Sequence, residues 1–227
     1  MISDPKFNTA KDWFEKLRDS LVETIQNIDE KEFEITHWDH KDEGGGKMSK
    51  IKGNIIEKGG VNISTVSGKF NENMQEMIPG AKDNPNYSAT GISVVLHPVS
   101  PKIPSMHFNT RFIKTNQEWF GGGMDITPCL VFNTQEKYHD GLEVLCNKYD
   151  KSYYPKFKKW CDDYFYLKHR NEPRGIGGIF FDYLQTGDWG KDFEFVQDVG
   201  TYFHKFIFNT LRSLKDEKWN DEDKKTQ

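Results

Sequence analysis

Histidine and arginine are the residues of this 227-residue sequence whose chemical types suggest a site. The seven histidines are His37, His40, His97, His107, His139, His169 and His204. None of their spacings is that of an HExxH motif or of a close metal-binding pair, so spacing alone gives a metal centre little support. Arginine is rare among the 31 basic residues, yet Arg111, Arg170 and Arg174 all fall in unusual stretches. Because a guanidinium forks onto a carboxylate, these three indicate an acidic ligand.

Residues 91–113 are predicted to bring several polar side chains onto one surface. They contain two runs with the alternation of β-strands, separated by a proline-rich connection, and each run has one apolar and one polar face. We expect an antiparallel hairpin with His97 opposite His107, and in that register Ser93 lies opposite Arg111. The resulting polar patch consists of Ser93, His97, His107, Asn109 and Arg111.

Residues 160–182, WCDDYFYLKHRNEPRGIGGIFFD, combine aromatic, charged and glycine residues in one short run. The first half has helical spacing, and Pro173 interrupts it because the residue before a proline avoids helical geometry. The second half is strand-like around Gly177 and Gly178. A glycine pair weakens a strand unless something approaches the backbone closely, and a ligand is one candidate. A buried helix, turn and strand without a ligand is the equally weighted alternative.

Apolar periodicity predicts the elements that would support these residues. Helices are expected over 9–28, 138–149 and 193–211, and strands over 51–56 and 61–66 with a turn at 58–60. Residues 118–128, EWFGGGMDITP, are expected to form a loop in which Asp125 caps a helix. The alternative is that the three glycines let the backbone approach a flat ligand. No role is predicted for residues 71–89.

Composition limits the classes of function. The length and the 35% hydrophobic content predict one domain with a substantial core. A net charge of -4 argues against a nucleic-acid partner or an anionic membrane held by a global field. The three cysteines, Cys129, Cys146 and Cys161, predict neither a disulfide framework nor a zinc site. No leader or membrane span is recognised, so a cytoplasmic protein is expected.

The 160–182 stretch resembles the signature of the oxygen-dependent coproporphyrinogen III oxidase family, and GGGKMSKIKGNIIEKGGVNISTVSG resembles the family's N-terminal block. The resemblance implies an α+β fold with a large, mostly antiparallel sheet flanked by helices on both faces. It implies His107 as proton donor, Asp125 facing the pyrrole N–H groups and Arg111 gripping a propionate. The implied substrate contacts are Ser93, Asn109, Thr110 and Arg111, and the implied ligands of a divalent cation are His97, His107, His139 and His169.

The implied reaction converts two propionates of coproporphyrinogen III to vinyl groups and gives protoporphyrinogen IX for haem synthesis. Molecular oxygen is the co-substrate, Mn²⁺ is a candidate cation, and the absence of a GxGxxG motif fits a reaction without flavin or NAD. Family members form homodimers and continue with further strands, so residues 1–227 are expected to be a single domain lacking the C-terminal segment. The alternatives are a non-catalytic tetrapyrrole-binding fragment and a histidine-carboxylate metal oxygenase of another family.

Overall fold

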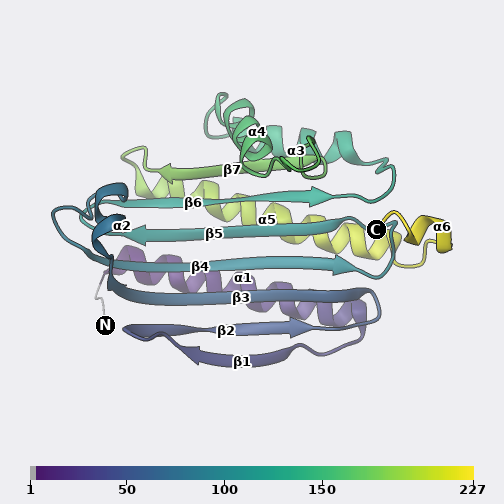
Figure 1. Cartoon of the computed structure of the whole chain (residues 1–227), viewed down its shortest axis with the longest axis horizontal. Coiled ribbons are helices and arrows are strands. Elements are labelled where there is room, and N and C mark those ends of the chain that lie inside the picture. Colours follow the sequence, from purple (N-terminus) through teal and green to yellow (C-terminus); the bar gives the residue numbers. More distant parts are fainter. Residues whose placement is uncertain (1–3) are drawn as a thin grey trace.

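The computed structural model describes residues 4–227, which form an α+β fold around one large antiparallel sheet (Figure 1). The sheet has seven strands in the order β1-β2-β3-β4-β5-β6-β7, so each strand pairs with its neighbours in sequence. The strands are β1 (Glu34–Asp39), β2 (Glu43–Ile51), β3 (Ile56–Lys69), β4 (Asn86–Pro98), β5 (Ser105–Lys114), β6 (Glu118–Thr127) and β7 (Gly177–Leu184). The predicted fold class is confirmed. Antiparallel pairing also places residues from different strands in straight rows across the sheet.

Two long helices, α1 (Pro5–Asp29) and α5 (Trp189–Leu214), pack against each other and cover one face of the sheet (Figure 1). Each begins at an aspartate whose carboxylate accepts backbone N–H groups: Asp4 accepts from Lys6 and Phe7, and Asp188 accepts from Lys191. Both helices bury an apolar stripe against the strands. The shorter helices are α2 (Glu72–Met77), α3 (Gln135–Asn147), α4 (Tyr153–Tyr164) and α6 (Asp221–Lys224).

Helix α4 lies along the edge strand β7 and contributes to both faces of the sheet (Figure 1). On the side of α5, Phe157 contacts Phe181 and Phe195. On the other side, Tyr164 stacks on Phe180 with 4.4 Å between ring centroids. Helix cover is therefore unequal, because α1 and α5 span one face while α4 covers only the β7 edge of the other.

The two faces of the central strands differ in the way that the alternation predicted. Ile92, Val94 and Leu96 of β4 are buried, and Phe108 of β5 stacks on Phe203 of α5 at 4.7 Å. Burying one such phenylalanine contributes about 1.5–3 kcal/mol. We call the opposite surface the open face, and from β4 and β5 it carries Ser93, Val95, His97, His107, Asn109 and Arg111.

The pairing of β4 with β5 corrects the predicted register by two residues. Ser93 lies opposite Asn109 and Val95 lies opposite His107, whereas the prediction placed His97 there. The connection sets this register, because Ile103 is fully buried and its N–H donates to the carbonyl of Ser100. A shift of two residues leaves every side chain on its face, so the predicted polar patch survives the correction.

The predicted turn at residues 58–60 is also wrong, since β3 runs straight through Gly59 and Gly60. The chain turns earlier, between β2 and β3. There the carboxylate of Asp29, at the end of α1, accepts backbone N–H groups of Asn54, Ile55 and Ile56 at 2.6–3.0 Å. This turn depends on a group about 25 residues away in sequence, so the local pattern could not reveal it.

Residues 118–128 form strand β6 instead of the expected loop with a capping aspartate. Within the strand, Gly121 and Gly123 lie on the open face and Gly122 faces the helices. A Cβ atom at Gly122 would lie 2.7 Å from the Thr110 methyl group. The glycine run therefore serves close packing between strands within this chain, and it does not break the strand.

Candidate active site on the open face of the sheet

Three charged or titratable groups converge where β5, β6 and the segment before β7 meet. The carboxylate of Asp125 is only 2% exposed. It accepts a hydrogen bond from His107 Nδ1 at 2.6 Å, and it accepts two from Arg174, at 2.9 Å from Nε and 2.7 Å from Nη2. A fork of this kind fixes the carboxylate in one orientation and compensates its buried charge. We call these three residues the His-Asp-Arg cluster.

Sequence reasoning identified Arg174 as unusual but gave it no partner. The turn at residues 165–176 brings it back over the sheet, and its guanidinium stacks on Phe165 at 3.7 Å from the ring centroid. Phe165 also contacts the His107 ring edge-on at 5.6 Å. One aromatic ring therefore contacts both the guanidinium and the imidazole of the His-Asp-Arg cluster. Arg170, in contrast, is exposed and pairs with Glu172.

The glycine pair of the 160–182 stretch serves the protein's own packing. Gly177 has φ of +73°, a conformation that favours glycine. A Cβ atom at Gly178 would lie 2.6 Å from the hydroxyl of Tyr138. The hydroxyl itself donates to the carbonyl of Gly177 at 3.3 Å. These contacts explain the glycines without a ligand, which favours the second of the two interpretations offered for that stretch.

Asn109 lies beside His107 on the open face, and its Nδ2 is 3.2 Å from His107 Nε2. Because Nδ1 donates to Asp125, neutral His107 leaves Nε2 as an acceptor for this amide. Asn109 Oδ1 is buried and has no protein partner among the described residues. Ser93 is exposed opposite Asn109, whereas the Thr110 side chain is 1% exposed and points toward the helices. Only backbone atoms of Thr110 can meet a ligand on the open face.

Arg111 extends across the neighbouring strands and donates from Nη2 to Asp182 Oδ2 at 2.6 Å. A Cβ atom at Gly121 would lie 3.1 Å from that Nη2, so glycine makes room for the ion pair. The Arg111 side chain remains 36% exposed. A guanidinium has five N–H donors, so one bond to Asp182 leaves donors for a ligand carboxylate.

The four histidines implied as metal ligands do not form one ligand set within the chain. His97 lies 3.4 Å from the Ser105 hydroxyl at the end of β4, His107 belongs to the His-Asp-Arg cluster, and His169 is exposed in the turn after α4. Across residues 4–227, no three His, Cys, Asp or Glu side chains are grouped to hold a metal ion. The donor set of this structure therefore does not fit the implied cation site.

His139 uses both ring nitrogens within the protein. Nε2 donates to the Ile176 carbonyl at 3.0 Å, so Nδ1 accepts from the Tyr154 hydroxyl at 3.1 Å. Burial lowers the pKa of His139, and the nearby Lys158 ammonium lowers it further. His139 thus links α3, α4 and the segment before β7. His204, to which no role was assigned, is also bonded within the protein. Its Nε2 lies 2.7 Å from the Thr24 hydroxyl, between α5 and α1.

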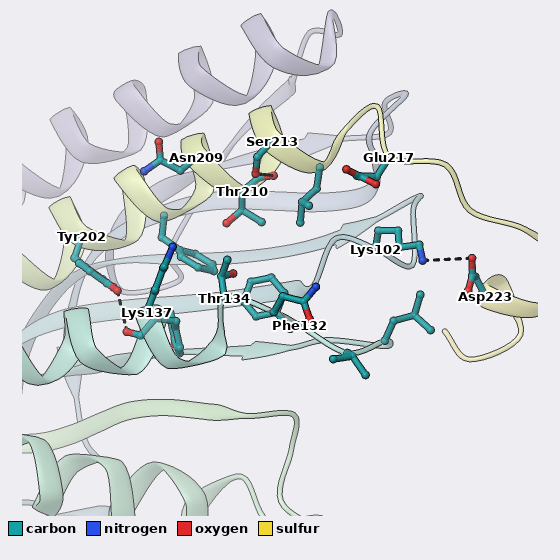
Figure 2. Close-up of a pocket in the computed structure, with 16 residues that line it drawn as sticks. Lys102, Phe132, Thr134, Lys137, Tyr202, Asn209, Thr210, Ser213, Glu217 and Asp223 are labelled. Carbon is teal, nitrogen blue, oxygen red and sulfur yellow. Dashed lines mark hydrogen bonds and ion pairs between the residues drawn. The ribbon is translucent and has the colours of Figure 1, made fainter.

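One large cleft lies away from every predicted site residue. It has a volume of about 740 Å³ and is bounded by the 130–134 segment, α3, the end of α5 and α6 (Figure 2). Lys102 and Asp223 form an ion pair at its rim. A second, shallower hollow of about 460 Å³ lies on the open face and includes Ser93, Asn109 and Arg111. The smaller hollow is therefore the one lined by residues predicted to contact a substrate, and it lies beside the His-Asp-Arg cluster through Asn109.

Comparison with known proteins identifies the family. The sequence model of the family described as coproporphyrinogen III oxidase matches residues 9–227. Two curated proteins named oxygen-dependent coproporphyrinogen-III oxidase, from Rickettsia akari (strain Hartford) and Rickettsia rickettsii (strain Sheila Smith), are each 48% identical to this chain. The alignments cover 96% and 95% of this chain and 82% and 81% of the relatives. The chain therefore belongs to the coproporphyrinogen III oxidase family.

Proposed function

We propose that this chain catalyses the oxygen-dependent decarboxylation of two propionates of coproporphyrinogen III to vinyl groups, giving protoporphyrinogen IX in haem synthesis. The relatives' names supply the reaction, and the His-Asp-Arg cluster is the observation in the structure that supports it best. The family assignment removes the alternative of a metal oxygenase from another family. A non-catalytic tetrapyrrole-binding protein of the same family is the remaining alternative.

Binding of the substrate is assigned to the polar part of the open face. Arg111 binds a propionate through donors that Asp182 leaves unused, while Ser93 and Asn109 supply a hydroxyl and an amide beside it. The same hollow is also lined by apolar side chains, so it can contact the macrocycle as well as a carboxylate of the substrate. The Thr110 contribution is limited to its backbone.

Proton handling is assigned to His107. Asp125 accepts from Nδ1 and so fixes the orientation of the ring, which leaves Nε2 as the atom that exchanges a proton with the substrate. Protonation of Nε2 would turn it into a donor facing the amide donor of Asn109. Rotation of that amide would present the unpaired Oδ1 instead, so Asn109 can serve either state of His107.

Asp125 has a positioning role in the state seen here, because Arg174 and His107 occupy its carboxylate and little of it is exposed. A direct contact with pyrrole N–H groups, as the family resemblance implies, requires Arg174 to give up part of its fork. In each half-reaction dioxygen adds to the pyrrole, takes up the two electrons, a β-hydrogen of the propionate and one further proton, and leaves as hydrogen peroxide, while the carboxylate leaves as carbon dioxide and the side chain becomes a vinyl group. This step needs no organic cofactor, since the electron-rich macrocycle is the reductant.

No step of the proposal is assigned to a metal ion, because the four implied histidines do not share one centre. A homodimer in the cytoplasm is the assembly and location that the family resemblance supports, and light scattering tests the assembly. Within the described residues, none of the helices combines the length and apolar character needed to cross a membrane.

The proposed function is tested by measuring oxygen uptake and carbon dioxide release together after adding coproporphyrinogen III. We expect both to begin on addition of the substrate and to stop when either propionate-bearing substrate or oxygen is exhausted. Coproporphyrinogen with all four propionates esterified is the matched control, because Arg111 has no carboxylate to bind. Oxygen uptake without carbon dioxide release would indicate only spontaneous oxidation of the macrocycle, and it would count against the proposal.

A further inference from the structure

One straight row of residues crosses the open face from the edge strand β1 to β6. Backbone pairing places Trp38 opposite Gly46, and the row continues through β3, β4 and β5. Its members are Trp38, Gly46, Ser64, Gly91, Arg111 and Gly121. Because directly opposed residues share a face of the sheet, all six lie on the open face. Small residues fill the middle, so Trp38 and Arg111 are large side chains on either side of a low floor.

The indole of Trp38 lies over strand β2. A Cβ atom at Gly46 would approach two carbons of the indole, Cε2 and Cζ2, to 2.9 Å. Glycine at this position therefore gives the ring room to lie across the neighbouring strand. This contact gives a role to part of the 44–46 glycine run, whose spacing is not that of a phosphate loop.

Trp38 contributes little to the core of this chain. It is 39% exposed, and all the other residues of β1 are exposed as well. Met48, the neighbour of Trp38 on the open face, is 44% exposed. A large aromatic and a methionine left in solvent beside a polar cluster are typical of a ligand surface.

The hollow of about 460 Å³ connects these apolar residues to the proposed substrate contacts. Its lining includes Trp38, Met48, Asn62, Ser64, Ser93, Asn109 and Arg111. Its volume falls in the range of about 300–1,000 Å³ that small-molecule sites occupy. One side is apolar and the other carries a guanidinium, which matches a ligand with apolar rings and peripheral carboxylates.

We propose that Trp38 is a substrate-contacting residue, whose indole packs against one pyrrole ring of the tetrapyrrole while Arg111 binds a carboxylate across the glycine and serine floor. This inference deepens the proposed function and rests on it. It extends the substrate surface from β4 and β5 to the edge strand β1. The indole supplies apolar contact and takes no part in proton transfer, so it affects substrate affinity more than the chemical step.

The first test compares Trp38→Ala and Trp38→Phe with Ile35→Ala, a control on the same strand but on its other face, where Ile35 is 48% exposed. Loss of aromatic packing should raise the KM for coproporphyrinogen III and the Kd for coproporphyrin III about tenfold in Trp38→Ala, with kcat changed less than about threefold. Trp38→Phe should retain most of the affinity, and Ile35→Ala should match the unmodified chain. Equal affinity in all four proteins would overturn the inference.

The second test does not depend on the folding of an alanine variant. The chain is labelled with 5-fluorotryptophan, and the fluorine resonance missing from Trp38→Phe is assigned to Trp38 among the six tryptophans. Added coproporphyrin III should shift this resonance more than the other five, because its ring current acts at short range. No shift, in a chain that binds the porphyrin and turns over substrate, would overturn the role of Trp38 alone. A chain that neither binds nor turns over would overturn the proposed function as well.

Discussion

Arg174 holds the buried carboxylate of Asp125 by both of its oxygens, through Nε at 2.9 Å and Nη2 at 2.7 Å. The two residues are 49 positions apart in sequence and belong to β6 and to the segment before β7. This ion pair joins the segment before β7 to Asp125 and, through Asp125, to His107, the proposed proton donor. Its loss should therefore affect both stability and activity.

Arg174→Ala should lower the free energy of unfolding by about 3 kcal/mol, because it leaves the Asp125 charge buried without its main partner. Arg170→Ala is the matched control in the same segment, and its exposed pair with Glu172 predicts a loss below about 0.5 kcal/mol. The double variant Arg174→Ala/Asp125→Asn should recover part of the stability, since no charge is left unpaired. Denaturant unfolding measures all three, and equal losses in the two arginine variants would contradict the role given to Arg174.

His107→Gln should reduce kcat at least about 100-fold, because the amide keeps a hydrogen bond to Asp125 but cannot exchange a proton. The Kd for coproporphyrin III should change less than about threefold, since His107 is not assigned to binding. Steady-state kinetics and a porphyrin titration separate the two effects. A parallel loss of binding and turnover would mean that His107 positions the substrate instead.

Arg111 and Asp182 offer variants with opposite expected effects. Arg111→Gln should raise the KM about tenfold or more by removing the carboxylate fork. Asp182→Asn should leave the KM unchanged or lower it, because Arg111 is released from its present partner. If the ion pair were only structural, both variants would raise the KM together, and that result would remove Arg111 from the substrate site.

Stability should fall at acidic pH through His204. Burial lowers the pKa of this residue in the folded chain below its usual value of 6.5. Above pH 6.5 the ring is neutral in both states; as the pH falls through 6.5 toward the lowered pKa, the unfolded chain binds a proton that the folded chain excludes. His204→Gln should therefore reduce the loss of unfolding free energy between neutral and acidic pH, compared with the unmodified chain. Identical pH profiles for the variant and the unmodified chain would contradict this.

Whether the four histidines form one cation site can be tested at His169, which is exposed in the turn after α4. A single four-histidine centre would require each ligand, so His169→Ala would then lower Mn²⁺ affinity strongly. The structure instead predicts a change of less than about twofold in Mn²⁺ affinity and in turnover. Calorimetric titration with Mn²⁺ and the activity assay decide between them.

Alternation and periodicity in the sequence correctly predicted which residues share a face of a strand and where the main helices lie. His107, Asn109 and Arg111 do share a face, and the helices over α1, α3 and α5 begin or end within a few residues of their expected bounds. These features are local, because side chains alternate between the two faces of a strand whatever position the strand has in the fold.

What the sequence could not supply depends on contacts between distant segments. The register of β4 on β5 is set by burial of Ile103, and the turn before β3 is set by Asp29. The partner of Arg174 was hidden because nothing in the order of residues shows where the 165–176 turn returns to the sheet. The order of residues likewise does not show that Trp38 and Arg111 lie in one row across the sheet, because that row depends on the pairing of β1 to β5.

The most direct test of the proposed function is an aerobic incubation of the purified chain with coproporphyrinogen III, with a parallel incubation under argon and a third with His107→Gln. Products are oxidised to fluorescent porphyrins and separated by chromatography. We predict protoporphyrin from the unmodified chain in air and none under argon or from His107→Gln. If the unmodified chain binds the macrocycle in air yet yields no protoporphyrin, the chain is a tetrapyrrole-binding protein and the proposed enzymatic function is wrong.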